Sequence, residues 1–271
     1  MPYCRYCGAE LEENAKFCSK CGTPVAMQMI EKREPTKRKR SSMSPWAIAG
    51  ITALVAVVIA SLIVIPLLFG GLFPFSRVVG SGNLRMQEET FSDFAIVDVG
   101  SGFKVNINQA SSYKIIIIAD DNLFDYIQVT KTGNALIIRL EPGVSYQTST
   151  LKVEVSMPDL QELRLSGGAN GTATGFVMSH DFGAELSGGS ILKMDGEANN
   201  LTATCSGGSN LELSEFVVNN ASIDFSGGSQ GTINLDGTLD ANLSGGSRLF
   251  YIGNPTLGDI KTSGGSSVSR R

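Results

Sequence analysis

Apolar and polar residues alternate with a period of two along much of the chain beyond residue 90, which predicts strands with one buried face each. Between residues 88 and 160 this pattern predicts antiparallel β-structure. The expected strands are Phe91–Val99, Phe103–Asn108, Tyr113–Ala119, Tyr126–Thr130, Ala135–Leu140 and Thr150–Ser156. Thr132-Gly133-Asn134 supplies a turn between two of them.

A repeat begins at residue 163, where the tripeptide Ser-Gly-Gly occurs six times. Its serines are Ser166, Ser187, Ser206, Ser226, Ser244 and Ser263. They follow one another at intervals of 21, 19, 20, 18 and 19 residues. A period near 20 without a helical pattern predicts a β-solenoid with one coil per repeat. Glycine suits the corner of each coil because tight turns need backbone angles that other residues avoid.

Alignment on these serines places apolar residues in columns. One residue before the serine stand Leu165, Leu186, Cys205, Phe225, Leu243 and Thr262, and three before stand Leu163, Ala184, Ala203, Ile223, Ala241 and Ile260. The column between them is polar: Arg164, Glu185, Thr204, Asp224, Asn242 and Lys261. This alternation predicts inward and outward columns in register across the coils.

The pattern resumes after each corner. Five and seven residues beyond the serine the positions are apolar or small, and the position between them is polar in four of five coils, with Phe250 as the exception. Phe176, Val217, Val218 and Leu239 are candidates for a third side. Cys205 is expected as a small buried hydrophobe. The serines of the corners are expected to form a hydrogen-bonded ladder between coils. A second ladder is expected three residues on, at Ala169, Ser190, Ser209, Ser229, Ser247 and Ser266.

An apolar run separates two differently charged parts of the chain. Residues 46–76 contain no charged residue, and Trp46–Phe69 is long enough to cross a bilayer. Residues 1–45 hold nine basic and five acidic residues (+4), and residues 77–271 hold 13 and 21 (−8), which together give the net charge of −4. We therefore predict a basic juxtamembrane linker at 27–44, a transmembrane helix at 45–73 and a second linker at 74–88. A cleaved signal peptide is disfavoured because a long cysteine-containing segment precedes the run.

The basic residues fix the expected orientation. Six of them lie between Lys32 and Arg40, before the apolar run, and only Arg77 follows it closely. By the positive-inside rule the N-terminus is cytoplasmic and the C-terminal domain is outside the cell. A single pass through membrane lipid is the expectation.

Four cysteines form two pairs near the N-terminus, Cys4-x2-Cys7 and Cys18-x2-Cys21. Two such pairs can complete a tetrahedral Cys4 site, so Cys4, Cys7, Cys18 and Cys21 are the predicted ligands of one structural Zn²⁺. Four thiolates leave no open position for catalysis, and two disulfides are the disfavoured alternative. The side chains expected to cover the site are Tyr3, Tyr6, Leu11 and Phe17.

The stretch from Tyr3 to Gly22 resembles the short zinc-ribbon family found at the N-termini of many prokaryotic membrane proteins. This predicts a zinc ribbon at 1–26. Only Arg5, Lys16 and Lys20 are basic within it, so nucleic acid is a poor expectation and a protein partner a better one.

Residues from about 90 onward resemble the auto-transporter adhesin (head GIN domain) family. The resemblance rests on the Ser-Gly-Gly repeats, the β-rich front half and the lead-in Ser156-Met157-Pro158-Asp159-Leu160-Gln161-Glu162-Leu163. The resemblance implies a right-handed parallel β-helix on the cell surface and no established activity. The expected fold is mainly β: a right-handed parallel β-helix or solenoid ectodomain at 89–271, preceded by one transmembrane helix and a small zinc ribbon.

No set of residues suggests catalysis. Glu185 and Asp224 share the outward column but stand about 10 Å apart by strand spacing, among mixed charges. His180, the only histidine, is expected in an exposed loop without a nucleophile beside it. We expect no enzyme; a glycan-active enzyme is the disfavoured alternative.

The expected function is a membrane-anchored, non-enzymatic surface module. Its ectodomain would bind a surface glycan or protein or sense the state of the envelope, and its ribbon would contact a protein. The alternative is a cell-surface adhesin without signalling. The last coil, ending at Arg270 and Arg271, is expected either to self-associate or to be blocked by these arginines. Sequons at Asn170, Asn200, Asn220 and Asn242 are compatible with an outside location and leave glycosylation open.

Overall fold

The computed structural model describes residues 3–4, 7–12, 15–22, 76–147 and 150–271. The chain divides into two compact units, Met1–Leu67 and Leu68–Arg271, and each is described by itself. The predicted linker at 27–44 and transmembrane helix at 45–73 lie outside the described residues and stay predictions. Among the described residues, no helix has the length and apolar character needed to cross a bilayer.

The second unit is almost entirely β-structure, as the alternation predicts. Its elements are β1 Ser76–Val79, β2 Leu84–Glu89, β3 Ile96–Val99, β4 Lys104–Gln109, β5 Lys114–Asp120, the 3-10 helix η1 Asp121–Tyr126, β6 Ile127–Thr132, β7 Ala135–Leu140, β8 Val144–Gln147, β9 Leu151–Met157, β10 Glu162–Leu165, β11 Asn170–Val177, β12 Phe182–Leu186, β13 Ile191–Cys205, β14 Asn210–Phe225, β15 Gln230–Leu235, β16 Thr238–Leu243, β17 Arg248–Ile252, β18 Thr256–Thr262 and β19 Ser267–Arg270.

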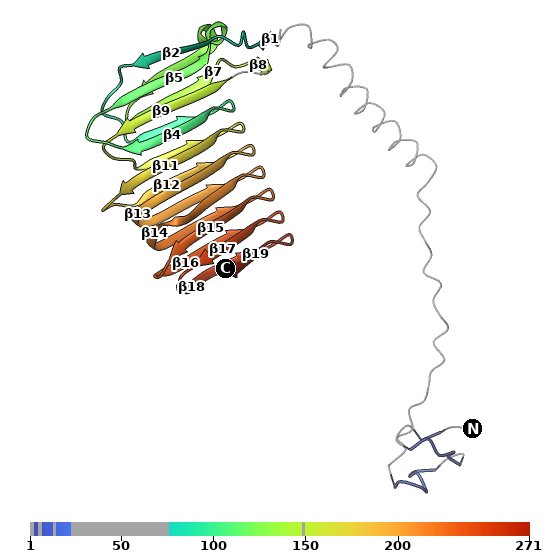
Figure 1. Ribbon diagram of the computed structural model, residues 1–271. Helices are drawn as coiled ribbons and strands as arrows, with labels where there is room; N and C mark the ends of the chain where they lie inside the picture. Colours follow the sequence, from blue (N-terminus) through green and yellow to red (C-terminus); the bar gives the residue numbers. More distant parts are fainter. Residues whose placement is uncertain (1–2, 5–6, 13–14, 23–75, 148–149) are drawn as a thin grey trace, which may run out of the picture. The chain divides into compact units, whose positions relative to one another are not determined.

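The repeats form parallel coils stacked in sequence order (Figure 1). The strands before each corner pair in register, so that Leu165 lies beside Leu186, then Cys205, Phe225, Leu243 and Thr262. We call this side the pre-corner face: β3, β10, β12, the ends of β13 and β14, β16 and β18. The strands that follow each corner form the post-corner face: β4, β11, the starts of β13 and β14, β15, β17 and β19.

The inward columns predicted from the sequence are confirmed. Leu165, Leu186, Cys205, Phe225 and Leu243 are at most 2% exposed, and the residues between them in the outward column face solvent. Each fully buried large side chain contributes roughly 1.5–3 kcal/mol of transfer free energy. The column ends at Thr262, which is exposed in the last coil.

The third side is confirmed in part. Phe176, Val218 and Leu239 are at most 4% exposed and belong to the core, whereas Val217 is 47% exposed. Neighbouring residues point to opposite faces of a strand, so only one of Val217 and Val218 can be buried.

Both glycines of every Ser-Gly-Gly corner have positive φ, from 57° to 68° for the first and from 77° to 83° for the second. The first glycine also packs against the corner of the neighbouring coil: a Cβ on Gly207 would lie 3.0 Å from the backbone nitrogen of Gly188. Hence the left-handed backbone and the close stacking both require glycine here.

In four corners the expected serine ladders between coils are replaced by bonds within the corner, whereas the hydroxyl of Ser266 in the last corner accepts from the amide of Ser247 in the neighbouring coil at 3.1 Å. The buried hydroxyl of Ser190 donates to the carbonyl of Ser187 in its own corner at 2.7 Å, and Ser209, Ser229 and Ser247 repeat this contact at 2.7–2.8 Å. These hydroxyls are satisfied locally because the sharp corner brings the carbonyl three residues back within reach.

The front half is only partly antiparallel, which corrects the prediction. The pairs β2–β5, β5–β9 and β6–β7 are antiparallel, but β3 and β4 form a further coil stacked in parallel on β10 and β11. Its corner is Gly100-Ser101-Gly102, with φ of 55° at Ser101 and 72° at Gly102. Alternation specifies which face a residue occupies and not the direction of pairing, so this coil could not be told from a hairpin.

Residues expected to be a linker also join this unit. β1 pairs in parallel with β8, and β2 pairs antiparallel with β5 at the end of the sheet. Among the described residues, the β-structure of this unit therefore includes Ser76 onward and not only residues from 89.

Candidate metal centre and surface sites

Two tight turns build the cysteine site of the first unit. The amides of Gly8 and Gly22 donate to the carbonyls of Cys4 and Cys18, each at 2.8 Å. Both glycines have positive φ, 69° and 72°, as expected of the residue after each Cys-x2-Cys pair. Each turn therefore closes with the same amide-to-carbonyl bond, and each carries one pair of cysteines.

The four sulfurs gather at one point. All of the Sγ atoms of Cys4, Cys7, Cys18 and Cys21 lie within 4.8 Å of one another, with 3.7 Å from Cys4 to Cys21 and 3.6 Å from Cys7 to Cys18. These separations are too long for disulfide bonds, which measure about 2.05 Å. A tetrahedral ion with sulfur ligands at about 2.3 Å requires sulfurs roughly 3.8 Å apart, so the cluster fits zinc.

The cover of this cluster differs from the prediction. Leu11 is 7% exposed and packs with Cys4 and Cys18, whereas Tyr3 and Phe17 are each 61% exposed. Tyr6 lies outside the described residues. The two exposed aromatic residues each precede the first cysteine of a pair, and they offer apolar surface for a contact rather than cover for the metal.

Charged side chains surround a shallow hollow of about 390 Å³ on the pre-corner face, lined in part by Asp98, Arg139, Arg164, Glu185 and Thr204. Arg139 pairs with Asp98 at 3.1 Å. Arg164 makes two hydrogen bonds to Glu162, at 2.7 and 2.8 Å, and lies 3.5 Å from Glu185.

These pairings define the electrostatics of the hollow. The bond to Glu162 raises the pKa of Arg164, and its guanidinium stays charged. Asp98, Glu162 and Glu185 each have an arginine partner. The neighbour of the Glu185 carboxylate is therefore a cation, and not a second carboxylate with which it could act as a catalytic pair. Ion pairs this exposed contribute about 0–1 kcal/mol each. The arrangement is that of a balanced, solvated face, as the sequence indicates.

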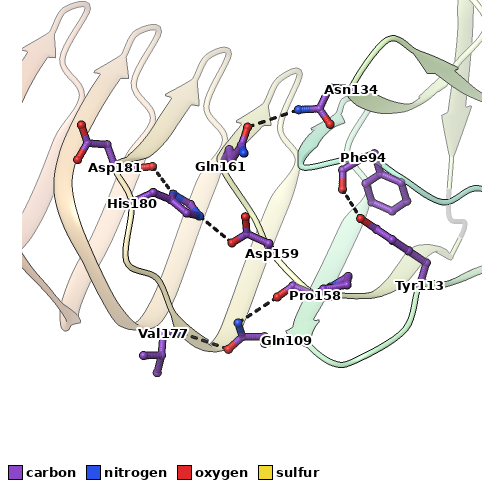
Figure 2. A network of polar contacts seen from close by, with 10 residues as sticks. All are labelled: Phe94, Gln109, Tyr113, Asn134, Pro158, Asp159, Gln161, Val177, His180 and Asp181. Carbon is purple, nitrogen blue, oxygen red and sulfur yellow. Dashed lines mark hydrogen bonds and ion pairs between the residues drawn. The ribbon is translucent and has the colours of Figure 1, made fainter.

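His180 lies in a polar network that the sequence did not predict (Figure 2). Its Nε2 lies 2.7 Å from Oδ1 of Asp159, and its Nδ1 lies 2.8 Å from the carbonyl oxygen of Asp181. Both ring nitrogens face acceptors, which favours the doubly protonated ring. The hydrogen bond to Asp159 and the bond to Asp181 raise the pKa of His180 above its usual value. His180 is half-buried and hydrogen-bonded, which corrects the expectation of an exposed histidine.

The lead-in from Pro158 to Gln161 is tied to its neighbours by further contacts (Figure 2). Gln109 donates to the carbonyl of Pro158 at 3.0 Å and accepts from the amide of Val177 at 3.2 Å. Asn134 donates to Gln161 at 3.4 Å. Together with the Asp159–His180 pair these bonds join the front half to the first coils, and the network has a structural role.

Cys205 is fully buried in the core, as expected, and burial raises its thiol pKa to about 12. A thiol held protonated and away from solvent is inert.

Three of the four sequon asparagines have engaged side chains. Asn220 donates to Asn200 at 2.8 Å, Asn200 donates to Asp181 at 2.8 Å, and Asn242 donates to Asp224 at 3.1 Å. The amides link neighbouring coils, so their visible role is structural.

Sequence reasoning missed the Asp159–His180 pair, although a signal was present. The two residues are 21 positions apart, the same interval as Ser166 and Ser187, and in a solenoid residues one repeat apart lie side by side.

Comparison with protein families gives two matches. Residues 3–25 match a zinc-ribbon domain, and residues 93–255 match the family described as "Putative auto-transporter adhesin, head GIN domain". The ribbon match and the four-cysteine cluster support one structural zinc ion. A search of curated proteins found no match.

Comparison with solved structures also gives matches. A crystal structure of a "putative adhesin" from Bacteroides fragilis is similar over 72% of this chain and 100% of its own, with a TM-score of 0.59 and 18% identity. A "putative lipid binding protein" from Parabacteroides distasonis matches over the same shares of the two chains with a TM-score of 0.46 and 16% identity. A "putative adhesin" from Parabacteroides merdae covers 72% and 99%, with a TM-score of 0.42 and 19% identity.

The stacked coils, the Ser-Gly-Gly corners and a family match that spans more than half of the residues lead to one assignment: this chain belongs to the auto-transporter adhesin, head GIN domain family.

Proposed function

We propose that this protein is a membrane-anchored, non-enzymatic surface module with a ligand-binding solenoid outside the cell and a cytoplasmic zinc ribbon. The observation that supports it most is the outward surface of the coils. Polar side chains line two sheet faces whose backbones are held by a continuous apolar core. Rigid repeats of this kind provide extended contact surfaces.

The proposed anchor is the segment at 45–73. Its 24-residue apolar run from Trp46 to Phe69 has no charged residue, and transfer of such a run into lipid is favourable. The basic residues between Lys32 and Arg40 would keep the N-terminal side in the cytoplasm. The reducing cytoplasm suits four thiolates, whereas an oxidising compartment would favour disulfides.

In the ribbon, Cys4, Cys7, Cys18 and Cys21 are the proposed ligands of the zinc ion. Metal binding would supply the folding free energy that so small a unit cannot obtain from its core, which among the described residues consists of Cys4, Leu11 and Cys18. The exposed rings of Tyr3 and Phe17 are the proposed contact for a protein partner.

Two uses of the outer domain are compatible with this layout. An adhesin needs only the solenoid and its anchor, whereas an envelope sensor also needs the ribbon to reach its cytoplasmic partner. The folded ribbon favours sensing, because surface attachment alone gives it no role. Self-association through the last coil also remains a proposal.

The test compares full-length protein with a variant that lacks residues 1–26, both expressed in cells. Surface attachment of cells to immobilised glycans and host proteins measures binding, and a crosslinking pull-down through the N-terminus measures the cytoplasmic contact. We expect attachment to survive the deletion and the cytoplasmic partner to be lost. If neither variant attaches to any surface, the binding role is refuted. If the full-length chain captures no cytoplasmic protein, the ribbon has no partner and the adhesin alternative stands.

A further inference from the structure

A second hollow lies on the post-corner face, across β14, β15 and β17. It has a volume of about 290 Å³. Its lining combines one aromatic ring, two amides, a hydroxyl and an ion pair, supplied by Asn210, Glu212, Gln230, Thr232, Phe250 and Arg271 together with Gly231. This mixture of groups differs from the hollow on the pre-corner face, which has no aromatic residue.

Phe250 is the unusual member of this set. It lies in register with Thr232 on one side and Ser269 on the other, and one coil beyond Thr232 with Glu212, in an outward column whose other residues are polar. Its ring is half-buried and does not belong to the apolar core, which it faces away from. Core packing therefore does not account for an aromatic residue at this position.

The polar groups around this ring are arranged by the coils. Asn210 and Gln230 pair in register two residues before Glu212 and Thr232, so all four point outward from adjacent strands. Coils are about 4.8 Å apart and residues two apart on a strand are about 7 Å apart. The array is therefore comparable in size to one or two sugar rings.

Donors and acceptors in this array are available. Among the described residues, the side-chain amides of Asn210 and Gln230 have no protein hydrogen-bond partner. Arg271 lies 3.8 Å from Glu212 and donates to the hydroxyl of Thr232 at 3.3 Å. Its guanidinium therefore lies beside the outward column that contains Phe250. The remaining N–H groups of Arg271 are available to a ligand. Glu212 and Arg271 cancel in charge.

We propose that this hollow binds one or two pyranose rings of a neutral saccharide. The face of Phe250 packs against the apolar C–H groups of a ring, and the amides of Asn210 and Gln230 with the Glu212–Arg271 pair bind its hydroxyls. A neutral, polyhydroxylated ligand fits because the site has paired donors and acceptors, a single apolar platform and no net charge from the Glu212–Arg271 pair. This inference rests on the proposed binding role of the outer domain and names its ligand class.

The test titrates the full-length protein in detergent micelles with four neutral trisaccharides: maltotriose, cellotriose, N,N′,N″-triacetylchitotriose and mannotriose. Isothermal titration calorimetry measures the affinity. We expect at least one to bind, and Phe250→Ala to weaken it about tenfold, which corresponds to about 1.4 kcal/mol. Phe250→Tyr keeps the ring and should retain binding. Val217→Ala, which shortens an exposed apolar residue on another side of β14, is the matched control and should change nothing.

Binding of none of the four sugars overturns the inference, and so does binding that Phe250→Ala leaves intact. If Phe250→Ala lowers the thermal midpoint of the domain, the double variant Asn210→Ala, Gln230→Ala tests the same site and should weaken binding several-fold. The cell-attachment assay distinguishes failure of the saccharide site from failure of the proposed binding role of the outer domain. If cells still attach through the full-length protein while all four sugars fail, only the saccharide site is wrong; if attachment also fails, the binding role is wrong too.

Discussion

The two glycines of one corner give a sharp test of how the coils stack. Gly207 and Gly208 both have positive φ, 64° and 77°, so alanine at either position adopts a left-handed backbone that costs about 1–2 kcal/mol. The surroundings differ. A Cβ on Gly207 would lie 3.0 Å from the nitrogen and 3.3 Å from the Cα of Gly188, whereas a Cβ on Gly208 would meet nothing within 4 Å. Overpacking against backbone adds about 1–3 kcal/mol to the first substitution alone.

We therefore expect Gly208→Ala to lower the thermal midpoint by roughly 2–8 °C and Gly207→Ala by roughly 2–12 °C more, since 1 kcal/mol shifts a domain of this size by about 2–4 °C. The assay is thermal unfolding of the full-length chain followed by the β-signal in circular dichroism. Both variants lie in one corner, so departures from two-state unfolding affect them alike. Equal losses would refute the close approach between corners, and no loss in Gly208→Ala would refute the left-handed backbone.

Three further predictions concern single side chains. Cys18→Ser should reduce the zinc content of purified protein from one ion per chain to nearly none by elemental analysis, because three thiolates bind the ion poorly; retention of a full equivalent would contradict the ligand assignment. Cys205 should resist iodoacetamide at pH 8 in the folded protein and react after denaturation, because burial raises its thiol pKa to about 12; labelling of the folded protein, detected by mass spectrometry, would show that the core is open there. His180→Gln should destabilise the protein by about 0.5 kcal/mol at pH 5.5, a size typical of an exposed ion pair. Because the folded-state pKa of His180 is raised, the stabilisation by its ion pair is complete below about pH 6.5 and is lost as the pH rises through the higher folded-state pKa. Chemical denaturation at pH 8.5 should therefore show little difference in unfolding free energy between the variant and the original protein. An equal loss at both pH values would exclude a charged pair.

The solenoid could be predicted because each coil repeats the same constraint. Glycine adopts the corner angles at the lowest cost, and only inward positions need apolar side chains, so the repeat and the columns appear directly in the sequence. The coil of β3 and β4 could not be found this way. Its corner has Gly100-Ser101-Gly102 in place of Ser-Gly-Gly, with Ser101 itself in the left-handed region at φ 55°.

Side-chain contacts between coils were harder to predict than burial. Ser190 has its carbonyl partner within its own corner, and this choice depends on local turn geometry that a column of serines does not reveal. In the ribbon, the cysteine spacing predicted the sulfur cluster, but Tyr3 and Phe17 were expected to cover it and are exposed. With so few residues, apolar character alone does not determine which side chains are buried.

The placement of the two domains on opposite sides of a membrane is the central claim, and epitope accessibility tests it most directly. A tag after Arg271 should be labelled by an impermeant reagent on intact cells, and a tag before Met1 should be labelled only after permeabilisation. The reverse pattern, or two tags that both require permeabilisation, would contradict the account.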